Sequence, residues 1–511
     1  MDSRGRGFTR GRAWAAAMAW LALVACGISA FAADIASVEP VPQNGDPGSW
    51  WQKRFAAKLA EAKAGGAPIV FLGDSITHNW ESRGRVVWED YFATGRYRAL
   101  NAGFSADRTE HLLWRLDHGM LDGFKAKAVV LMIGTNNTGH RTVDAEPPID
   151  TIIGIRAVLL KIREKQPEAK VILHPIFPRG RFKDDPLRVR NMIVNKEIRH
   201  FADGKDVWWC DFNDQLLDAE GRLPREIMQD YLHPNAYGYE VWANALLPYL
   251  DAALDGIGDR KMPQRLPASA DAAVFGNASL ACVPQSIIGH RYTWNKAQWW
   301  WLDRMAEKRR QVASSGGSID IVFVGDSITH NWESRGRSGT CYTDLQKEFS
   351  ILNLGYSGDS TQHALWRLKN GELAGYKAKV FMVMIGTNNN MSEDLGKPEN
   401  VSAAIREIVE TIRSRQPQAK VLLLPVFPRR PKPTDAARLH NAEVSRLIRP
   451  LADGKDVIWC DFTDKLLTPD GVLTKEIMPD SLHPAEPGYR IWMEACLPYF
   501  RKFCGKTPPA K

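Results

Sequence analysis

Short apolar runs, many of them β-branched, alternate with longer amphipathic stretches along the whole chain. Such near-continuous runs are typical of strands in a parallel sheet that is covered on both faces. The stretches between them, such as residues 151–164 and 401–413, have the length of helices, and Gln-Pro follows each of them closely as a stop signal. A last helix is expected to begin near Tyr237, and another near Tyr489. The apolar runs cover residues 69–72, 128–133, 171–174 and 207–210, then 321–324, 380–385, 421–424 and 457–460.

This pattern occurs twice because the chain contains a tandem duplication. Residues 73–85 and 325–337 share the same sequence, Gly-Asp-Ser-Ile-Thr-His-Asn-Trp-Glu-Ser-Arg-Gly-Arg, at an offset of 252 residues. The offset falls to 250 further along, and a single gap of two residues in the alignment of the two copies explains this change. The period is far longer than the roughly 20–50 residues of a solenoid repeat. Alternating strands and helices in each copy predict two tandem α/β domains, each a three-layer α/β/α sandwich with a parallel sheet.

The repeat boundaries divide the chain into four parts. Residues 1–32 are expected to be a signal peptide, 33–252 a first domain, 253–290 a linker with several Gly and Pro residues, and 291–511 a second domain. A hydrophobic content of 44% and a charged content of 25% fit ordinary globular domains.

The N-terminal segment predicts export. Four arginines precede an apolar run at residues 13–25, and Ala30-Phe31-Ala32 fits a cleavage site with small residues. A lipobox-like alternative ends at Cys26, which would then carry a lipid anchor. We favour ordinary cleavage because the apolar stretch continues past Cys26 to the Ala-x-Ala site. An uncleaved anchor is a third interpretation. In each case the protein leaves the cytoplasm, for the periplasm or the exterior.

Charge and cysteine content exclude several classes of function. The net charge is +8 and falls to about +5 without residues 1–32, and no basic stripe with interleaved aromatics is present, which argues against a nucleic-acid partner. No later segment approaches the ~18 apolar residues of a membrane span. No Cys/His spacing predicts a metal site, and we expect no cofactor.

Cys210 and Cys460 end apolar runs and are expected to be buried thiols. Export would permit disulfides among Cys282, Cys341, Cys496 and Cys504, whose pairing the sequence leaves open, as it does the oligomeric state.

Four polar motifs recur at matching positions in both copies. A Ser that follows a strand is by itself no more than a helix-cap candidate. Here Gly-Asp-Ser is accompanied by Gly-Thr-Asn, by an Asn-x-Gly turn and by Asp-x-x-His near the end of each copy. The order Ser, Asp, His occurs in other α/β hydrolases. Because the Ser and Asn motifs follow strands, they are expected to meet at the carboxyl edge of one sheet. The motifs begin at Gly73, Gly134, Asn101 and Asp230, and at Gly325, Gly386, Asn353 and Asp480.

Over nearly all of both domains, these motifs resemble the SGNH or GDSL-type hydrolases. Within that family, the similarity is strongest to the group of platelet-activating factor acetylhydrolase Ib catalytic subunits and their bacterial relatives. Gly-Asp-Ser, Leu-Trp-Arg-Leu, Ile-Gly-Thr-Asn-Asn and Leu-His-Pro carry the resemblance. It implies a flavodoxin-like sheet and a serine esterase without metal or cofactor.

The resemblance assigns roles to the repeated residues. Ser75 and Ser327 would be nucleophiles, His233 and His483 their bases, and Asp230 and Asp480 would orient the imidazoles. An oxyanion would be held by the Ser N–H, by a backbone N–H of the second motif and by an Asn amide. The last two donors would come from Ala106 and Asn136 in the first domain, and from Gly358 and Asn388 in the second.

Ala106 departs from the family pattern, in which this position is a glycine. Alanine keeps the backbone donor, so the change is harmless unless the turn needs a positive φ. In that case the Cβ costs about 1 kcal/mol or more and tilts the donor. The sequence alone leaves open whether catalysis in the first domain is weaker.

Further repeated residues have less specific signals. His78 and His330 are expected to cap or to support the site rather than to catalyse. Trp80, Arg83, Trp332 and Arg335 fit either a substrate rim or packing of the first helix, with packing favoured. Arg179 and Arg429 are candidate substrate contacts, and Leu-Trp-Arg-Leu is expected to pack a helix face.

These observations predict an exported esterase that removes short acyl groups, acetyl foremost, from O-acylated substrates through an acyl-enzyme. Among small-molecule and glycan esters, we expect the substrate to be an acylated carbohydrate. A phospholipid acyl hydrolase is the nearest alternative. A non-catalytic glycan-binding module is the alternative from another class, but complete Ser, Asp, His and Asn sets in both copies argue against it. Fold alone does not decide the substrate.

Overall fold

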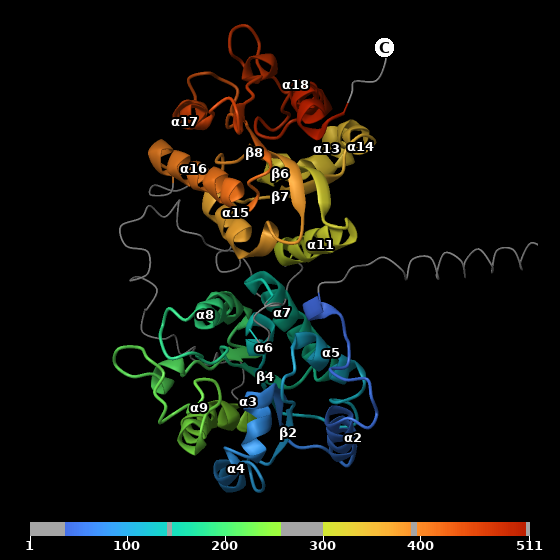
Figure 1. The fold of residues 1–511 in the computed structure, drawn as a ribbon, viewed down its shortest axis with the longest axis vertical. Helices are drawn as coiled ribbons and strands as arrows, with labels where there is room; N and C mark the ends of the chain where they lie inside the picture. The colour runs from blue at the N-terminus through green and yellow to red at the C-terminus, as the bar shows by residue number, and fades with distance from the viewer. Residues whose placement is uncertain (1–35, 140–145, 257–299, 390–395, 507–511) are drawn as a thin grey trace, which may run out of the picture.

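The computed structural model describes residues 36–506 apart from 140–145, 257–299 and 390–395. It contains two five-stranded sheets, in the orders β2-β1-β3-β4-β5 and β7-β6-β8-β9-β10, with every pair of neighbouring strands parallel. Figure 1 shows the two sheets with their helices as two successive units. The predicted pair of flavodoxin-like α/β/α sandwiches is therefore confirmed. The strands are β1 (Ile69–Gly73), β2 (Ala99–Gly103), β3 (Ala128–Met132), β4 (Lys170–Leu173), β5 (Val207–Trp209), β6 (Ser318–Gly325), β7 (Ile351–Gly355), β8 (Lys377–Met384), β9 (Lys420–Leu423) and β10 (Val457–Trp459).

Eight of these strands coincide with the apolar runs, but β2 and β7 were missed. The segments that begin with Asn101-x-Gly and Asn353-x-Gly were predicted to be turns. The first three residues of each instead end a strand, in which Asn101 and Asn353 are buried. The Oδ1 of Asn101 accepts the Gly103 N–H at 2.9 Å, and Asn353 does the same for Gly355. A polar side chain that bonds its own backbone interrupts the apolar pattern without interrupting the strand.

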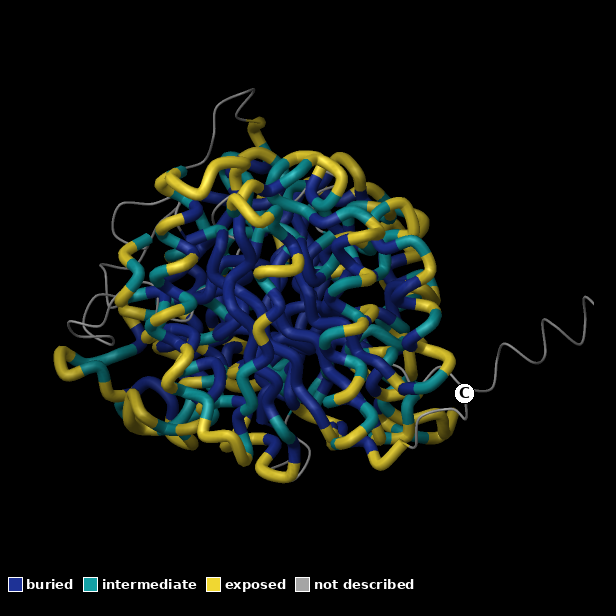
Figure 2. The backbone as a smooth tube through the Cα atoms, turned by 90° about the horizontal axis from the view of Figure 1, so that it is seen from above, coloured by how far each residue is buried: buried dark blue, intermediate teal, exposed yellow. Residues whose placement is uncertain are grey.

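Helices cover both faces of each sheet. In the first domain α2, α5, α7 and α8 pack on the face that carries Val70 and Leu72, whereas α3, α4 and α9 pack on the face of Ile69 and Phe71. The second domain repeats this arrangement. Figure 2 shows the buried residues in the interior and the exposed residues around the periphery. The helices of the first domain are α2 (Trp50–Lys63), α3 (Ser75–His78), α4 (Arg85–Tyr91), α5 (Thr109–Asp117), α6 (Thr135–Gly139), α7 (Pro148–Lys165), α8 (Pro186–Ile198) and α9 (Ala236–Asp255). Those of the second are α11 (Trp300–Ser314), α12 (Ser327–His330), α13 (Arg335–Ser338), α14 (Cys341–Gln346), α15 (Thr361–Arg367), η7 (Leu368–Glu372), α16 (Pro398–Arg415), α17 (Ala436–Ile448) and α18 (Glu486–Cys504).

Several predictions fall partly or wholly outside the described residues. The signal peptide with Cys26 does so, as do Cys282 and most of the linker; α9 runs to Asp255. Cys210 and Cys460 are buried thiols as expected, and no disulfide joins the cysteines within the described ranges. None of the helices in the described part is long and apolar enough to cross a membrane.

The two domains contact each other through different surfaces. The first domain contributes α7, and the second contributes α11 and η7 (Figure 1). The Arg309 guanidinium on α11 forms a bidentate ion pair with the Asp150 carboxylate on α7. Its Nε donates to Oδ1 at 3.1 Å and its Nη2 to Oδ2 at 2.9 Å. Gly371 lies so close to Pro147 that an added Cβ would stand 2.6 Å from the proline Cβ. Trp301 and Arg304 of α11 make the same contacts as Trp51 and Arg54 of α2, so the repeat equivalent of Arg309 is Leu59. The equivalent of Asp150 is Asn400, and because both equivalents are uncharged they cannot form this ion pair.

In each domain the short helix that begins with the repeated Ser lies directly against the second strand. A Cβ at Gly103 would stand 2.3 Å from the His78 nitrogen and 2.5 Å from the Thr77 carbonyl carbon. Gly355 is equally close to the backbone of His330. These neighbours are backbone atoms, which cannot rotate away as a side chain can. Glycine at the end of β2 therefore sets how closely α3 approaches the sheet.

We expect Arg309→Leu to destabilise the protein, because it leaves Asp150 with 9% side-chain exposure and without its cation. Removing one partner of a buried pair costs about 3 kcal/mol or more. Thermal unfolding monitored by circular dichroism measures the change. The control is Lys125→Ala, whose ion pair with Glu168 is 84% and 78% exposed and should contribute nothing measurable. Equal midpoints for the two variants would contradict a stabilising role for this junction.

Gly103→Ala is expected to destabilise the first domain by about 1–3 kcal/mol, because α3 must move off the sheet to make room. Gly45→Ala is the matched control, since nothing lies within 4 Å of its added Cβ. Chemical unfolding of both variants provides the comparison. If Gly103→Ala unfolded at the same denaturant concentration as Gly45→Ala, the packing of α3 on β2 would be looser than described.

Candidate active site

The predicted site residues of each domain lie on segments that follow the carboxyl ends of its strands. Ser75 begins α3 directly after β1, and Asn136 lies in α6 after β3. The turn with Ala106 follows β2, while Asp230 and His233 lie in the loop before α9. Parallel strands end at a common edge, so side chains from segments distant in sequence meet there. The second domain has the same arrangement around Ser327.

Ser, His and Asp form a continuous hydrogen-bonded chain in both domains. The Ser75 Oγ lies 2.9 Å from the His233 Nε2, and the His233 Nδ1 lies 2.9 Å from the Asp230 Oδ2. The corresponding distances for Ser327, His483 and Asp480 are 2.8 and 2.9 Å. This geometry allows the imidazole to accept the serine proton while the carboxylate holds the other ring nitrogen.

The Asp carboxylate is held by several donors at once. Burial opposes ionisation of Asp230, but the backbone N–H groups of His233 and Leu232 and the imidazole outweigh it and lower the pKa of this carboxyl to about 2. Asp480 has the same donors and the same lowered pKa of about 2. The residue after each Asp, Tyr231 or Ser481, has a positive φ that turns the chain back toward the histidine.

An arginine from the segment after α3 completes this group, but it differs between the copies. In the first domain Arg83 pairs with Asp230 at 2.9 Å. In the second, Arg337 pairs with Asp480 at 3.3 Å, and Arg337 is the repeat equivalent of Arg85 rather than of Arg83. Trp80 and Trp332 are buried among aromatic rings, in agreement with the packing interpretation. Arg83 therefore contacts the site in the first domain. In the second domain Arg337, rather than the repeat equivalent Arg335, makes this contact.

Asp74 and Asp326, to which the sequence assigned no role, cap the helices that carry the serines. The Asp74 Oδ1 accepts the Ile76 N–H at 2.9 Å, and Asp326 does the same for Ile328. Burial raises the pKa of each carboxyl to about 7. The cap is thus the Asp, and the Ser is the first helical residue. An Asp directly before the first residue of a helix is itself a cap signal, which could have identified it.

The turn after the second strand does require a positive φ. Ala106 has a φ of 63°, and Gly358 has a φ of 83°. An L-residue with a Cβ pays about 1–2 kcal/mol in this region, whereas glycine does not. The Asn136 Nδ2 donates to the Asp107 carbonyl oxygen at 2.9 Å, which ties this turn to the segment after β3, and Asn388 does the same for Asp359 at 2.8 Å. One of the two amide hydrogens of each Asn makes this bond.

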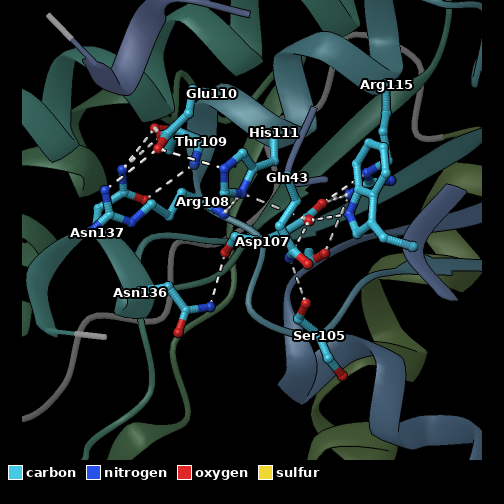
Figure 3. Close-up of polar contacts among 12 residues, drawn as sticks. Gln43, Ser105, Asp107, Arg108, Thr109, Glu110, His111, Arg115, Asn136 and Asn137 are labelled. Atoms are coloured by element: carbon cyan, nitrogen blue, oxygen red, sulfur yellow. Dashed lines mark hydrogen bonds and ion pairs between the residues drawn. The ribbon is translucent and has the colours of Figure 1, made fainter. Parts of the chain in front are cut away.

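A fully buried Asp anchors the same turn (Figure 3). The Asp107 carboxylate accepts hydrogen bonds from Trp51 at 2.7 Å and from Arg115 at 2.8 Å. Asp359 is held in the same way by Trp301 and Arg367. The arginine of Leu-Trp-Arg-Leu therefore forms a buried ion pair, which the expectation of helix-face packing did not include. The available signal was the repetition of this arginine, which is the seventh residue of both α5 and α15.

The remaining candidates have structural partners. The Arg179 Nη1 donates to the Thr135 carbonyl oxygen at 3.0 Å, and Arg429 does the same to Thr387 at 2.9 Å. These arginines thus support the segments that carry Asn136 and Asn388. Among the described residues, no cluster of three or more His, Cys, Asp and Glu side chains is arranged to hold a metal ion.

The described surroundings of Asn137, which follows Asn136, differ from those of its equivalent Asn389 in the second domain. The Asn137 Nδ2 donates to Glu110 at 3.2 Å and to Glu146 at 3.1 Å, and Arg108 lies beside both carboxylates (Figure 3). Burial raises the pKa of Glu146 to about 7. In the second domain Asn389 donates instead to the neutral Gln362. Within the described residues, which omit 390–395 of the second domain, this charged group lies beside the turn of the first copy.

Comparison with known proteins places this geometry in a family. The GDSL-like Lipase/Acylhydrolase family model matches residues 71–241 and 323–491, more than half of the chain. Platelet-activating factor acetylhydrolase IB subunit alpha1 of Bos taurus is 31% identical over 224 residues, which cover 42% of this chain and 90% of that protein. The alpha2 subunit of Rattus norvegicus is 37% identical over 171 residues, covering 33% and 71%.

Among solved structures, Axe2, an acetylxylan esterase from Geobacillus stearothermophilus, is similar with a TM-score of 0.30 and 20% identity, over 38% of this chain and 97% of that one. The two matched regions coincide with the two sandwiches. The chain belongs to the GDSL-like lipase/acylhydrolase family and carries two copies of its domain.

Proposed function

We propose that both domains are serine esterases that work through an acyl-enzyme. The Ser–His–Asp chain, present twice with separations of 2.8–2.9 Å, is the observation that carries this proposal. His233 would take the Ser75 proton as the oxygen attacks the ester carbonyl, and would then return it to the departing alcohol. Water would release the acyl group by the same route. Ser327, His483 and Asp480 would act likewise in the second domain.

The developing oxyanion would be met by three donors in each domain. These are the serine N–H, the N–H of Ala106 or Gly358, and the side-chain amide of Asn136 or Asn388. One such donor contributes about 2.7–4 kcal/mol to the transition state. Support comes from the turn itself, because its positive φ and its bond to the Asn amide bring the second and third donors together. No step needs a metal ion or a cofactor.

For the acyl group we propose acetyl or another short chain, which the names of the acetylhydrolase relatives support. For the alcohol portion we propose a carbohydrate. Tyr237 lies four residues after His233 with 58% of its surface exposed, and Phe182 is 51% exposed. Gly180, two residues before Phe182, bonds the Tyr231 carbonyl oxygen at 2.9 Å, which keeps this loop beside the histidine. Exposed aromatic faces suit the apolar face of a sugar ring. The N-terminal segment supports export.

A phospholipid is the second candidate for the alcohol portion. The curated relatives are named for hydrolysis of platelet-activating factor, and they share 31–37% identity with the matched regions. The same catalytic chain would serve either alcohol, so the choice depends on the rim of each site.

The first test removes each nucleophile. Ser75→Ala and Ser327→Ala should each leave turnover of p-nitrophenyl acetate, and the double variant should leave almost none. Because Ala106 strains its turn, Ser327→Ala should cost more than Ser75→Ala. Ala106→Gly in the Ser327→Ala background should then raise kcat by about tenfold, less than the roughly 100-fold or more that a whole donor contributes.

Equal rates from the two single variants, without a response to Ala106→Gly, would mean that the turn tolerates alanine. Turnover that survives in the double variant would exclude these serines as nucleophiles.

The second test varies the ester. We expect kcat/KM to fall from acetyl to butyryl to octanoyl esters of p-nitrophenol, and to be higher for acetylated sugars than for a short-chain phospholipid. A chelator should leave these rates unchanged, whereas a serine-directed phosphonate should abolish them. A maximum at octanoyl would instead indicate a lipase, and a preference for the phospholipid would favour the second candidate.

A further inference from the structure

His78 lies between the helix that begins with Ser75 and the turn that contains Ala106. Its Nδ1 lies 2.8 Å from the Ser105 Oγ and accepts the Ser105 backbone N–H at 3.3 Å. The second domain repeats the contact, with the His330 Nδ1 2.9 Å from the Ser357 Oγ. Neither histidine belongs to the Ser–His–Asp chain, and both copies keep the residue pair.

The surroundings of His78 keep its ring neutral and in one orientation. Trp50 stacks on the ring, with centroids 6.0 Å apart and planes inclined by 16°, and Trp300 stacks on His330 in the same way. Burial and the neighbouring Arg54 lower the pKa of His78 to about 4, against the opposite effect of Glu81. A neutral ring that accepts the Ser105 N–H at Nδ1 carries its proton on Nε2, the nitrogen that faces Glu81 at 3.9 Å.

Ser105 is held at three atoms, and this determines the direction of the next N–H. His78 holds its nitrogen and hydroxyl, and the Gln43 Nε2 donates to its carbonyl oxygen at 2.8 Å (Figure 3). The Ser105 carbonyl and the Ala106 N–H belong to one planar, trans peptide and point in opposite directions. Fixing the carbonyl therefore fixes the N–H. On the other side of Ala106, Asp107 is fixed by Trp51 and Arg115.

We propose that His78 and His330 are positioning residues that aim the oxyanion donor of the turn, with Gln43 holding the other end of the same peptide in the first domain. The proposal rests on the function proposed above and adds residues to it that do not touch the reacting atoms.

The test uses the full chain with Ser327→Ala, so that only the first domain turns over. His78→Leu removes the acceptor and should lower kcat for p-nitrophenyl acetate about tenfold, with KM changed less than about twofold, because a tilted donor weakens only the transition state. His78→Asn offers an amide oxygen near the position of Nδ1 and should recover most of the rate. Gln43→Met keeps the side-chain length, removes the donor and should also lower kcat.

His118→Leu is the matched control, because His118 is an exposed histidine that stacks on Trp114 and bonds its carbonyl oxygen. It should leave kcat unchanged. His330→Leu and His330→Asn in a Ser75→Ala background repeat the test in the second domain, and apply as well if the first domain alone shows no turnover.

The proposal is overturned if Asn is as poor as Leu at position 78, if the loss appears in KM with kcat retained, or if Gln43→Met leaves kcat unchanged. The Gln43→Met measurement tests the proposal even if His78→Leu fails to fold. Failure of the proposed function looks different, because turnover would then persist in the Ser75→Ala, Ser327→Ala double variant.

Discussion

The buried carboxylates of Asp107 and Asp359 hold the candidate sites together. Each has no exposed surface and accepts hydrogen bonds from a tryptophan on one helix and an arginine on another. Burial raises the pKa of each to about 6, although the arginine and the tryptophan act in the opposite direction. Loss of one partner from such a pair leaves an uncompensated group in the interior, at about 3–5 kcal/mol. The turn before each Asp therefore cannot move without breaking the group.

Because the buried Asp holds the turn in place, short segments are sufficient to bring the site residues together. The Asn136 amide binds the Asp107 carbonyl oxygen, and the same turn places the Ala106 N–H. The helix with Ser75 is capped by the buried Asp74 and lies against glycine at the end of β2. The serine, the turn and the asparagine thus follow three neighbouring strands whose register is fixed by the sheet. Only Asp230 and His233 come from outside it, on a loop that their own backbone bonds hold.

Both domains keep the buried Asp107 and Asp359 that anchor the turn, whereas residues on loops beside the site differ between the domains. Both copies keep the Ser, His, Asp and Asn contacts, yet the strained positions differ. The first domain has alanine at a positive φ where the second has Gly358, and the second has Arg430 at a positive φ where the first has Gly180. Both positions belong to loops beside the site. The junction through Asp150 and Arg309 is asymmetric, so each copy presents a different surface to the other.

The sequence by itself determined the sheet class and the duplication, and it named the candidate site side chains. Apolar runs report strands that are buried on both faces, and a repeat of thirteen identical residues needs no coordinates. It missed β2 and β7 because Asn101 and Asn353 satisfy their backbone inside the strand, which the apolar pattern cannot show. Only the tertiary structure decided the φ of Ala106, the capping by Asp74 and the burial of Arg115 against Asp107. These depend on which segments the fold brings together, and residue types at a given spacing do not encode that.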